Sequence, residues 1–366
     1  MATISLCMIV KNEESTLPRC LESVQGLVEE VIVVDTGSTD HTKEAARQYT
    51  PLVFDYPWHD DFAAARNFSF ARATQDYCLW LDADDVLLPP DRARFARMKE
   101  ALPPDTDVVM LPYHAGRDQA GRPALTYYRE RLLRRQGGFV WEGVVHEAIT
   151  PAGKVVYGDA AVTHSKTGPG DPGRNLRILE NAKRERPLSP REQFYYAREL
   201  AALGRDGDAA GAFHQFLEEG GGWVENKKQA CLDLAGCLLR LGKKEQALAA
   251  LLRCLALGPP SGELCCAMGD YFLGEGRLPA AVFWYEAALA RPRDGRDGGF
   301  LSPDCYGYHP CLQLCVCHYR LGDAALARAY NRRAARYKPE SAVCRENEAF
   351  FAALEKNRPL LPSPAR

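Results

Sequence analysis

Three aspartates stand close together after a short apolar run of the chain. Asp82, Asp84 and Asp85 follow residues 77–80 (YCLW), a run typical of a buried strand. Mg²⁺ and Mn²⁺ prefer oxygen ligands and share their remaining positions with substrate phosphates. Clustered carboxylates at the end of a strand therefore indicate a metal and phosphate site, although Asp clusters also form ordinary turns. Both interpretations are open on these residues alone.

Two more polar clusters follow the first two apolar runs. Residues 11–14 (KNEE) come directly after the first run, and residues 35–40 (DTGSTD) come after the second. An aspartate there can accept a hydrogen bond from a nucleobase or a ribose hydroxyl, and Gly37 permits close backbone approach. Ser, Thr and Asp also cap helices, which is compatible with binding. We expect both clusters to face the same sheet edge as Asp82.

Hydrophobic patterning indicates the elements that hold these clusters. Up to about residue 165, apolar runs alternate with amphipathic stretches. We expect strands at 4–10, 31–34, 52–54, 78–81 and 108–111, and helices at 16–27, 42–49, 62–73 and 91–101. Such alternation implies right-handed crossovers and an α/β fold with a mostly parallel sheet. Ligands of such sheets bind beyond the carboxyl ends of the strands, which is where the Asp cluster falls.

Beyond about residue 187 the pattern becomes all-helical. A glycine is followed five positions later by an alanine in four places: Gly204/Ala209, Gly242/Ala247, Gly276/Ala281 and Gly322/Ala327. The glycines are 38, 34 and 46 residues apart, and a period near 34 is that of tetratricopeptide-type helix-turn-helix repeats. The longest interval contains residues 293–299, which we interpret as a surface loop. The array offers either a groove for a peptide or partner protein, or a support that buttresses the first domain or self-associates.

Composition narrows the class of protein. The 366 residues are 46% hydrophobic and 26% charged with a formal net charge of -2, as expected for two soluble globular domains. The basic residues are dispersed, so nothing indicates a nucleic-acid partner. The spacing of the 13 cysteines does not fit a zinc site, and the chain shows no pattern of a secretory signal. We therefore expect the cysteines to be reduced thiols. Without an apolar run of about 18 residues we expect a cytoplasmic protein, with a peripheral position at the inner membrane face as the alternative.

Four motifs, in this order, resemble those of the inverting family 2 glycosyltransferases of GT-A fold. They are residues 8–14, 34–40, 61–67 and 81–85, and the resemblance covers roughly residues 3–166. Residues 139–147 (FVWEGVVHE) resemble a motif of one subgroup of this family. That subgroup contains lipooligosaccharide-core glucosyltransferases and enzymes that glycosylate peptide cysteines, and several of its members also carry C-terminal helical repeats. We therefore expect a GT-A domain at 1–168, a linker and helix at 169–190, tetratricopeptide-like repeats at 191–345, and a helix end and tail at 346–366.

The resemblance implies a site for a nucleotide-sugar donor, a UDP- or GDP-sugar. Glu13 and Asp35 would hold the nucleoside, and Asp82 would lie at the ribose or behind the metal. Arg66 would add positive charge near the nucleotide, since guanidinium suits phosphate. An ordinary surface ion pair is the alternative for Arg66.

The resemblance also implies a divalent metal cofactor, Mn²⁺ or Mg²⁺. Asp84 would bind the cation that bridges the two donor phosphates, and His164 would complete its shell. A lone histidine is more often a satisfied or solvent-facing residue, which is the alternative for His164. His146 is a weaker choice, and Asp85 is left to shape the turn.

Inversion at the anomeric carbon is a single displacement, which needs a carboxylate to take the acceptor's proton. Glu147 is our choice because Val-His-Glu is the subgroup's pattern, and Glu142 is the alternative. A partner role beside Arg131 or Arg134 is the competing interpretation of Glu147. Trp141 is an acceptor-site candidate because aromatic rings stack on sugars, although such residues more often belong to the core.

These residues together predict a metal-dependent inverting hexosyltransferase with a saccharide, lipid-linked or peptide acceptor. The alternative is an inactive GT-A domain in a repeat-based interaction scaffold, which intact Asp82, Asp84, Asp35 and Glu147 argue against. A nucleotidyltransferase would need a glycine-rich phosphate loop after the first strand, where residues 11–14 stand instead.

Overall fold

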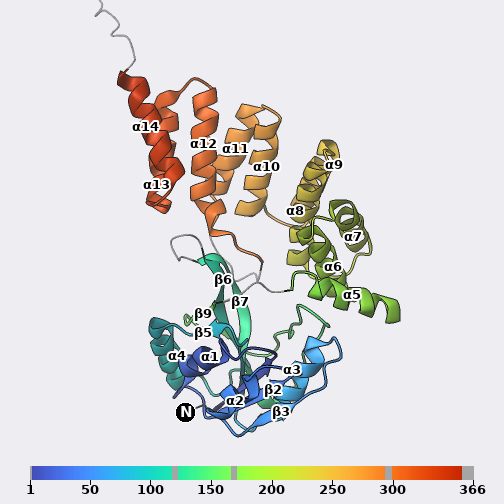
Figure 1. The fold of residues 1–366 in the computed structure, drawn as a ribbon. Coiled ribbons are helices and arrows are strands. Elements are labelled where there is room, and N and C mark those ends of the chain that lie inside the picture. The colour runs from blue at the N-terminus through green and yellow to red at the C-terminus, as the bar shows by residue number, and fades with distance from the viewer. Residues whose placement is uncertain (1, 118–122, 166–170, 293–298, 357–366) are drawn as a thin grey trace, which may run out of the picture. The chain divides into compact units, whose positions relative to one another are not determined.

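The computed structural model describes residues 2–117, 123–165, 171–292 and 299–356 (Figure 1). The chain divides into two compact units, residues 1–243 with 295–300, and residues 244–294 with 301–366. The first unit contains an α/β sheet domain followed by four helices, and the second is helical. The domain limits expected at residues 168, 190 and 345 stay predictions.

The first half of the sheet is parallel. Its strands lie in the order β3 (Val53–Asp55), β2 (Glu30–Asp35), β1 (Ile4–Val10) and β4 (Tyr77–Trp80), joined through α1 (Leu17–Val24), α2 (Thr42–Arg47) and α3 (Phe62–Phe70). The register pairs Val10 with Asp35, so the polar clusters that follow β1 and β2 leave the sheet side by side. The expected strands and helices of this half are confirmed, with ends that shift by a few residues.

The second half of the sheet is mixed. It contains β5 (Asp85–Val86), β6 (Val108–Arg117), β7 (Pro123–Arg134), β8 (Val155–Tyr157) and β9 (Val162–His164), with α4 (Pro89–Ala101) between β5 and β6. Strand β7 lies antiparallel between β4 and β6, and β5 pairs antiparallel with β9. Five of the eight strand pairings among the described residues are parallel, which confirms the mostly parallel sheet.

Burial explains why the parallel strands were readable from the sequence. Strand β1 (ISLCMIV) is an almost unbroken apolar run, and only Ile9 of its seven residues is not fully buried. Both faces of such a strand are covered by helices, so no polar alternation is needed. Helix α1 places Leu17, Cys20, Leu21 and Val24 on one buried face, at the spacing of an amphipathic helix.

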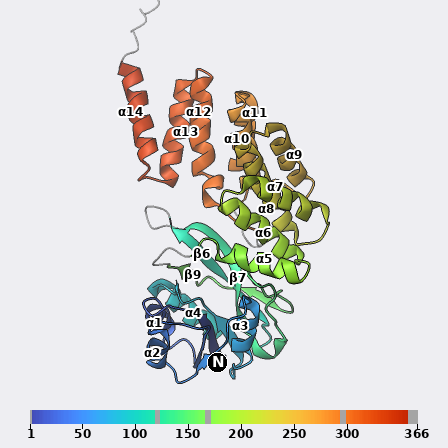
Figure 2. The ribbon, with the colours of Figure 1, turned by 45° about the vertical axis from the view of Figure 1, so that its right-hand side comes forward.

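Helices continue the first unit and make up the second. The first unit adds η1 (Arg135–Gly137), α5 (Arg174–Glu185), α6 (Pro190–Ala202), α7 (Asp206–Glu218) and α8 (Val224–Arg240). The second unit contains α9 (Lys244–Leu255), α10 (Gly262–Gly274), α11 (Leu278–Leu289), η2 (Pro303–Tyr306), α12 (Tyr308–Arg320), α13 (Ala324–Tyr337) and α14 (Ala342–Lys356). Within it, α10 packs on α11 and α12 on α13, as Figure 2 shows.

The glycine and alanine pattern has the expected structural basis. The four glycines have φ of +73°, +74°, +69° and +88°, and each follows the end of a helix: Gly204, Gly242, Gly276 and Gly322. Glycine adopts this left-handed conformation without the steric cost that a Cβ brings. The alanines five positions later are all 0% exposed: Ala209, Ala247, Ala281 and Ala327. The tetratricopeptide-like organisation is therefore confirmed, while residues 293–298 of the expected loop lie outside the described residues.

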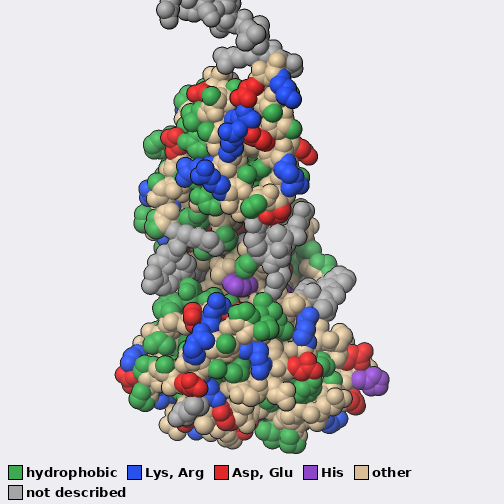
Figure 3. Space-filling model, turned by 90° about the vertical axis from the view of Figure 1, so that its left-hand side faces the viewer, with side chains coloured by type: hydrophobic (Ala, Val, Ile, Leu, Met, Phe, Trp, Pro, Cys, Tyr) green, Lys and Arg blue, Asp and Glu red, His purple; other side chains and the backbone are tan. Residues whose placement is uncertain are grey.

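Surface and cysteine chemistry agree with a globular chain. All 13 cysteines are free thiols, and only Cys305 among them is not fully buried. On the face shown in Figure 3, basic and acidic side chains are interspersed. Among the described residues, no helix is both long enough and apolar enough to cross a bilayer.

Candidate active site

A cleft of about 580 Å³ lies in the first unit where β1 and β4 end. Its lining comes from the ends of β1 and β2, the loop after β4, strands β6, β7 and β9, the segment before residue 148, and helices α3, α5 and α6. Residues that line it include Lys11, Glu13, Arg66, Asp82, Asp84, Tyr127, Arg129, Arg131, His146, Glu147, His164, Arg174, Asn175 and Glu199. The polar ends of the parallel strands thus meet in one cavity, as the sequence predicts.

Asp84, Asp85 and His164 form a cluster that could hold a cation. Each offers one ligand atom, and these atoms all lie within 4.8 Å of one another. Nδ1 of His164 lies 3.3 Å from Oδ1 of Asp84 and 3.6 Å from Oδ1 of Asp85. Two carboxylates and an imidazole suit Mn²⁺, and the carboxylates also suit Mg²⁺. The residues present therefore fit the metal that the sequence analysis expects.

The pairing of β5 with β9 builds this cluster. Its register sets Asp85 opposite His164, and Asp84 precedes β5 directly. From the sequence we expect Asp85 only to shape the turn, whereas the structure places it in the cluster, fully buried. A strand of two residues has no readable periodicity, so this placement had no sequence signal beyond the adjacency of Asp85 to Asp84.

His164 and the two carboxyls are electrostatically linked. Hydrogen bonding to Asp84 and then Asp85 raises the pKa of His164 to about 10, against a smaller opposing effect of burial. Without a cation the imidazole is thus protonated at neutral pH. A cation and this proton compete for the same ring nitrogen, since metal ligands must be deprotonated.

Arg131 forms an ion pair with Asp85 of the cluster. Its Nη1 lies 3.0 Å from Oδ2 of Asp85 and donates to the carbonyl oxygen of Trp80 at 3.1 Å. The guanidinium lies 3.7 Å from the centre of the Trp80 ring. Both partners of the ion pair are buried, so removal of either would leave an uncompensated buried charge.

Arg66 joins two acidic residues of the cleft. Its Nη2 lies 2.6 Å from Oδ1 of Asp82, and its Nε lies 2.6 Å from Oε1 of Glu147. The guanidinium also lies about 5 Å from the ring centres of Trp80 and Trp141. Arg66 is buried, so the surface ion pair considered from the sequence does not occur.

Arg66 also controls the charge of Asp82. Burial alone would raise the pKa of Asp82, but the charges of Arg66 and Arg131 outweigh it and lower that pKa to about 2. Burial disfavours the charged guanidinium, yet Asp82 and Glu147 together raise the pKa of Arg66 above its ordinary value. The ion pair of Arg66 with Asp82 is therefore charged throughout the neutral range.

The two candidate bases lie in different surroundings. Glu147 is buried, lines the cleft and pairs with Arg66 rather than with Arg131 or Arg134. Glu142 is exposed, does not line the cleft, and pairs through its backbone with Ala148.

Trp141 belongs to the packed interior. It is 2% exposed and packs edge-on against Trp80, with ring centres 4.9 Å apart. It lies against Arg66 and is not among the residues that line the cleft.

Glu13 and Asp35 lie at the ends of β1 and β2. Oδ1 of Asp35 accepts hydrogen bonds from the backbone N–H groups of Gly37 and Ser38, both at 2.9 Å. Its Oδ2 is buried without a hydrogen-bond partner in the described part of the chain. Glu13 lines the cleft, and burial raises its pKa, with the charges of Asp84 and Asp82 adding to the effect and a hydrogen bond from Thr16 opposing it.

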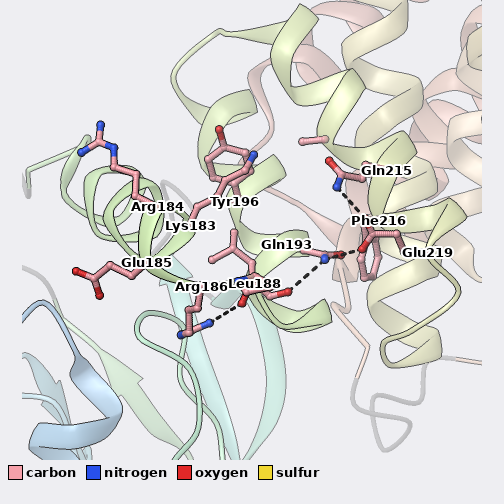
Figure 4. A pocket seen from close by; sticks show the side chains of 12 residues that line it. Lys183, Arg184, Glu185, Arg186, Leu188, Gln193, Tyr196, Gln215, Phe216 and Glu219 are labelled. Carbon is pink, nitrogen blue, oxygen red and sulfur yellow. Dashed lines mark hydrogen bonds between the residues drawn. The ribbon is translucent and has the colours of Figure 1, made fainter.

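A second cleft lies on the helices of the first unit (Figure 4). Its volume is about 560 Å³, and it lies among α5, α6 and α7. Its lining side chains bond mainly to one another, as with Gln193 and Gln215, which both donate to Glu219. Over the described ranges, only Asp84, Asp85 and His164 form a group of three metal-binding side chains. The first cleft is therefore the candidate active site.

Comparison with known proteins agrees with this assignment. Residues 5–152 match the family model described as glycosyl transferase family 2. A TPR repeat-containing protein of Synechococcus elongatus is 31% identical over 302 residues, which cover 80% of this chain and 68% of that protein.

Two further relatives are glycosyltransferases. The prophage-derived glycosyltransferase SunS of Bacillus subtilis is 28% identical over 57% of this chain and 51% of its own length. The lipopolysaccharide core biosynthesis glycosyltransferase LpsC of Rhizobium meliloti is 31% identical over 42% of this chain and 58% of its own length. The matched regions thus span between half and about two thirds of these three relatives.

Proposed function

Because the chain belongs to glycosyltransferase family 2 and carries a tetratricopeptide-like helical region, we propose that it is a metal-dependent inverting hexosyltransferase. Its donor is a nucleotide-diphosphate sugar, a UDP- or GDP-sugar. The observation that carries this proposal is that Asp84 and His164, backed by the buried Asp85, line the same cleft as the ion-paired residues Asp82, Arg66 and Glu147.

The donor is held by residues at the strand ends. Asp35 accepts from the nucleoside through its free Oδ2, and Glu13 lies beside it at the end of β1. Asp82, kept ionised by Arg66, accepts from the ribose. Asp84, Asp85 and His164 would hold a Mn²⁺ or Mg²⁺ ion, which when bound supplies positive charge to the donor diphosphate.

The transfer is a single displacement. A hydroxyl or thiol of the acceptor attacks the anomeric carbon as the bond from that carbon to the diphosphate oxygen breaks, and the nucleoside diphosphate leaves with the electron pair. Glu147 takes the proton of the attacking group. The bond from Arg66 Nε to Oε1 of Glu147 orients the carboxyl group before the acceptor arrives.

The acceptor is a saccharide, a lipid-linked saccharide or a peptide side chain. The name of the Rhizobium relative places that protein in lipopolysaccharide core biosynthesis, which supports a saccharide or lipid-linked acceptor. A carboxylate base suits hydroxyl and thiol acceptors alike.

A donor screen tests the proposal before any acceptor is known. The purified chain is incubated with UDP-, GDP- and CMP-sugars with and without Mn²⁺, and both the melting temperature and the slow release of nucleotide are measured. We expect one class of donor to raise the melting temperature and to release nucleoside diphosphate only with metal. If no donor binds and none is hydrolysed in any metal condition, the enzyme assignment is wrong. That result would favour the alternative, an inactive GT-A domain in a repeat-based interaction scaffold.

A further inference from the structure

The segment that carries Glu147 is fixed by one helix of the helical region. Residues 143–147 form a loop between the exposed Glu142 and the bridge at Ala148. Four residues of α6 contact this loop or its side chains: Arg191, Glu192, Tyr195 and Glu199. Their spacing of one, four and eight residues from Arg191 places them along one side of the helix.

His146 makes the closest contacts. Its Nε2 lies 2.7 Å from Oε1 of Glu199, and its ring stacks on Tyr195 with centres 4.0 Å apart and planes 11° from parallel. Asn175 of α5 also donates to Oε1 of Glu199, at 3.0 Å. The hydrogen bonds from His146 and Asn175 hold the pKa of Glu199 below its ordinary value although burial, the largest single effect, opposes them.

The backbone of the loop is held as well. Nε of Arg191 donates to the carbonyl oxygen of His146 at 2.8 Å, and the N–H of Val144 donates to Oε1 of Glu192 at 3.2 Å. On the other side, the N–H of Phe62 donates to the carbonyl oxygen of Val144 at 2.9 Å. The loop is therefore clamped between the start of α3 and the side of α6.

His146 adopts a backbone conformation that needs such support. Its φ is +49°, in the left-handed region that residues with a Cβ rarely adopt. Non-glycine residues persist there only when the surrounding structure holds them, and they concentrate at functional sites. His146 directly precedes Glu147, so any release of this strain would move the carboxyl group that meets Arg66.

We propose that α6 is a positioning element of the active site: Glu199 and Tyr195 lock His146 and thereby fix Glu147 for proton transfer. His146, Tyr195 and Glu199 are positioning residues, because they act through Glu147. This inference rests on the proposed function. It means that α6, the second helix of the helical region, contributes to catalysis by positioning Glu147. The donor-side residues Asp35 and Asp84 come from the sheet domain, at the end of β2 and directly before β5.

The proposal separates two kinetic quantities. Loosening Glu147 should lower the turnover for transfer but leave the KM for the donor nearly unchanged. A displacement of about 1 Å at a reacting group can cost about 100-fold in rate. We expect Glu199→Ala and Tyr195→Ala each to lower kcat about 10- to 100-fold, with the donor KM within about twofold of the parent protein.

Matched variants separate positioning from general damage. Tyr195→Phe keeps the ring that stacks on His146, so it should restore most of the activity that Tyr195→Ala loses. Tyr196→Ala removes the neighbouring aromatic residue, which lines the second cleft (Figure 4) and whose ring centre lies 4.5 Å from Nζ of Lys183, and should leave kcat unchanged. His146→Asn tests the loop side, because Asn tolerates a positive φ but cannot stack on Tyr195.

A structural readout makes the outcomes distinct. Hydrogen exchange of the amides of residues 143–147 should accelerate in Glu199→Ala and His146→Asn but not in Tyr196→Ala. If the parent protein transfers sugar while these variants match Tyr196→Ala in both kcat and exchange, the positioning role is wrong and the proposed function stands. If exchange accelerates as expected but the parent protein neither binds nor hydrolyses any donor, the clamp is real and the proposed function fails.

Discussion

Asp85 of β5 lies opposite His164 of β9 in the antiparallel pairing of the two strands. This single register brings an imidazole from the end of the sheet domain to the carboxylates that follow β4. Arg131 balances the buried charge of Asp85 from the other side. The three residues therefore depend on one another for their positions, and we expect the loss of any one of them to weaken metal binding by the whole cluster.

The metal cluster predicts a sharp loss on removal of one ligand. Asp84→Ala should weaken Mn²⁺ binding and lower metal-dependent donor hydrolysis by about 100-fold or more, since removal of an essential metal ligand removes the charge on the diphosphate. Isothermal titration of the apo protein with Mn²⁺ measures the first effect directly. The control is Asp105→Asn, which changes an exposed carboxyl group that pairs with Lys154. This variant should bind Mn²⁺ normally. Unchanged Mn²⁺ affinity in Asp84→Ala would remove this residue from the cluster.

Glu147→Gln should separate donor binding from transfer. The amide oxygen of Gln can still accept from Arg66, so the cleft should keep its shape, but Gln cannot take a proton at neutral pH. We expect a normal donor-induced thermal shift and a loss of transfer of about 100-fold or more, within the range for general-base removal. Glu142→Gln changes an exposed carboxyl and should retain activity. Loss of donor binding in Glu147→Gln would instead assign Glu147 to holding the cleft together.

Glu192 should contribute stability that depends on pH. It completes a capping box with Ser189 and accepts two bonds from Arg186. Burial would raise the pKa of Glu192, but Arg186, Ser189 and Val144 lower it to about 2, from an ordinary value of 4.5. The folded state thus binds fewer protons, so this stability is complete above pH 4.5 and is lost as the pH falls toward 2.

Urea unfolding of Glu192→Ala tests this prediction. We expect a loss of about 2–3 kcal/mol at pH 7, combining the cap and the buried ion pair, and a smaller difference from the parent protein at pH 3. Glu185→Ala, an exposed neighbour on α5, should change stability by less than about 0.5 kcal/mol. A difference that is constant across this pH range would show that the cap, and not the charge, provides the stability.

Two glycines at the end of α10 should respond in opposite directions to the same substitution. Gly276 has φ of +69°, and a Cβ added there meets no atom within 4 Å, so Gly276→Ala should cost about 1 kcal/mol from backbone strain alone. Gly274 is helical with equal space around it, so Gly274→Ala should stabilise by about 0.5–1 kcal/mol. Thermal unfolding of both variants measures the difference. Equal effects would mean that Gly276 does not need its left-handed conformation.

The local patterns of the chain were sufficient for much of the fold. The apolar runs of β1, β2 and β4 predicted a parallel sheet, because strands buried on both faces have no polar alternation. The glycines after α6 and α8 predicted helix ends, because only glycine adopts a left-handed conformation without strain. Strand β7 was missed, since Arg129, Glu130 and Arg131 conceal a strand whose charges are paired inside the fold.

The sequence by itself predicted the glycosyltransferase family, and six of its nine candidate site residues line the cleft, because motifs and hydrophobic periodicity are local properties of the chain. Only the tertiary structure decided that Asp85 belongs with His164, that Arg66 joins Asp82 to Glu147, and that α6 holds His146. Each of these contacts joins residues that no sequence period relates. They form only when the packed sheet and helices bring charged groups together and exclude the water that would otherwise separate them.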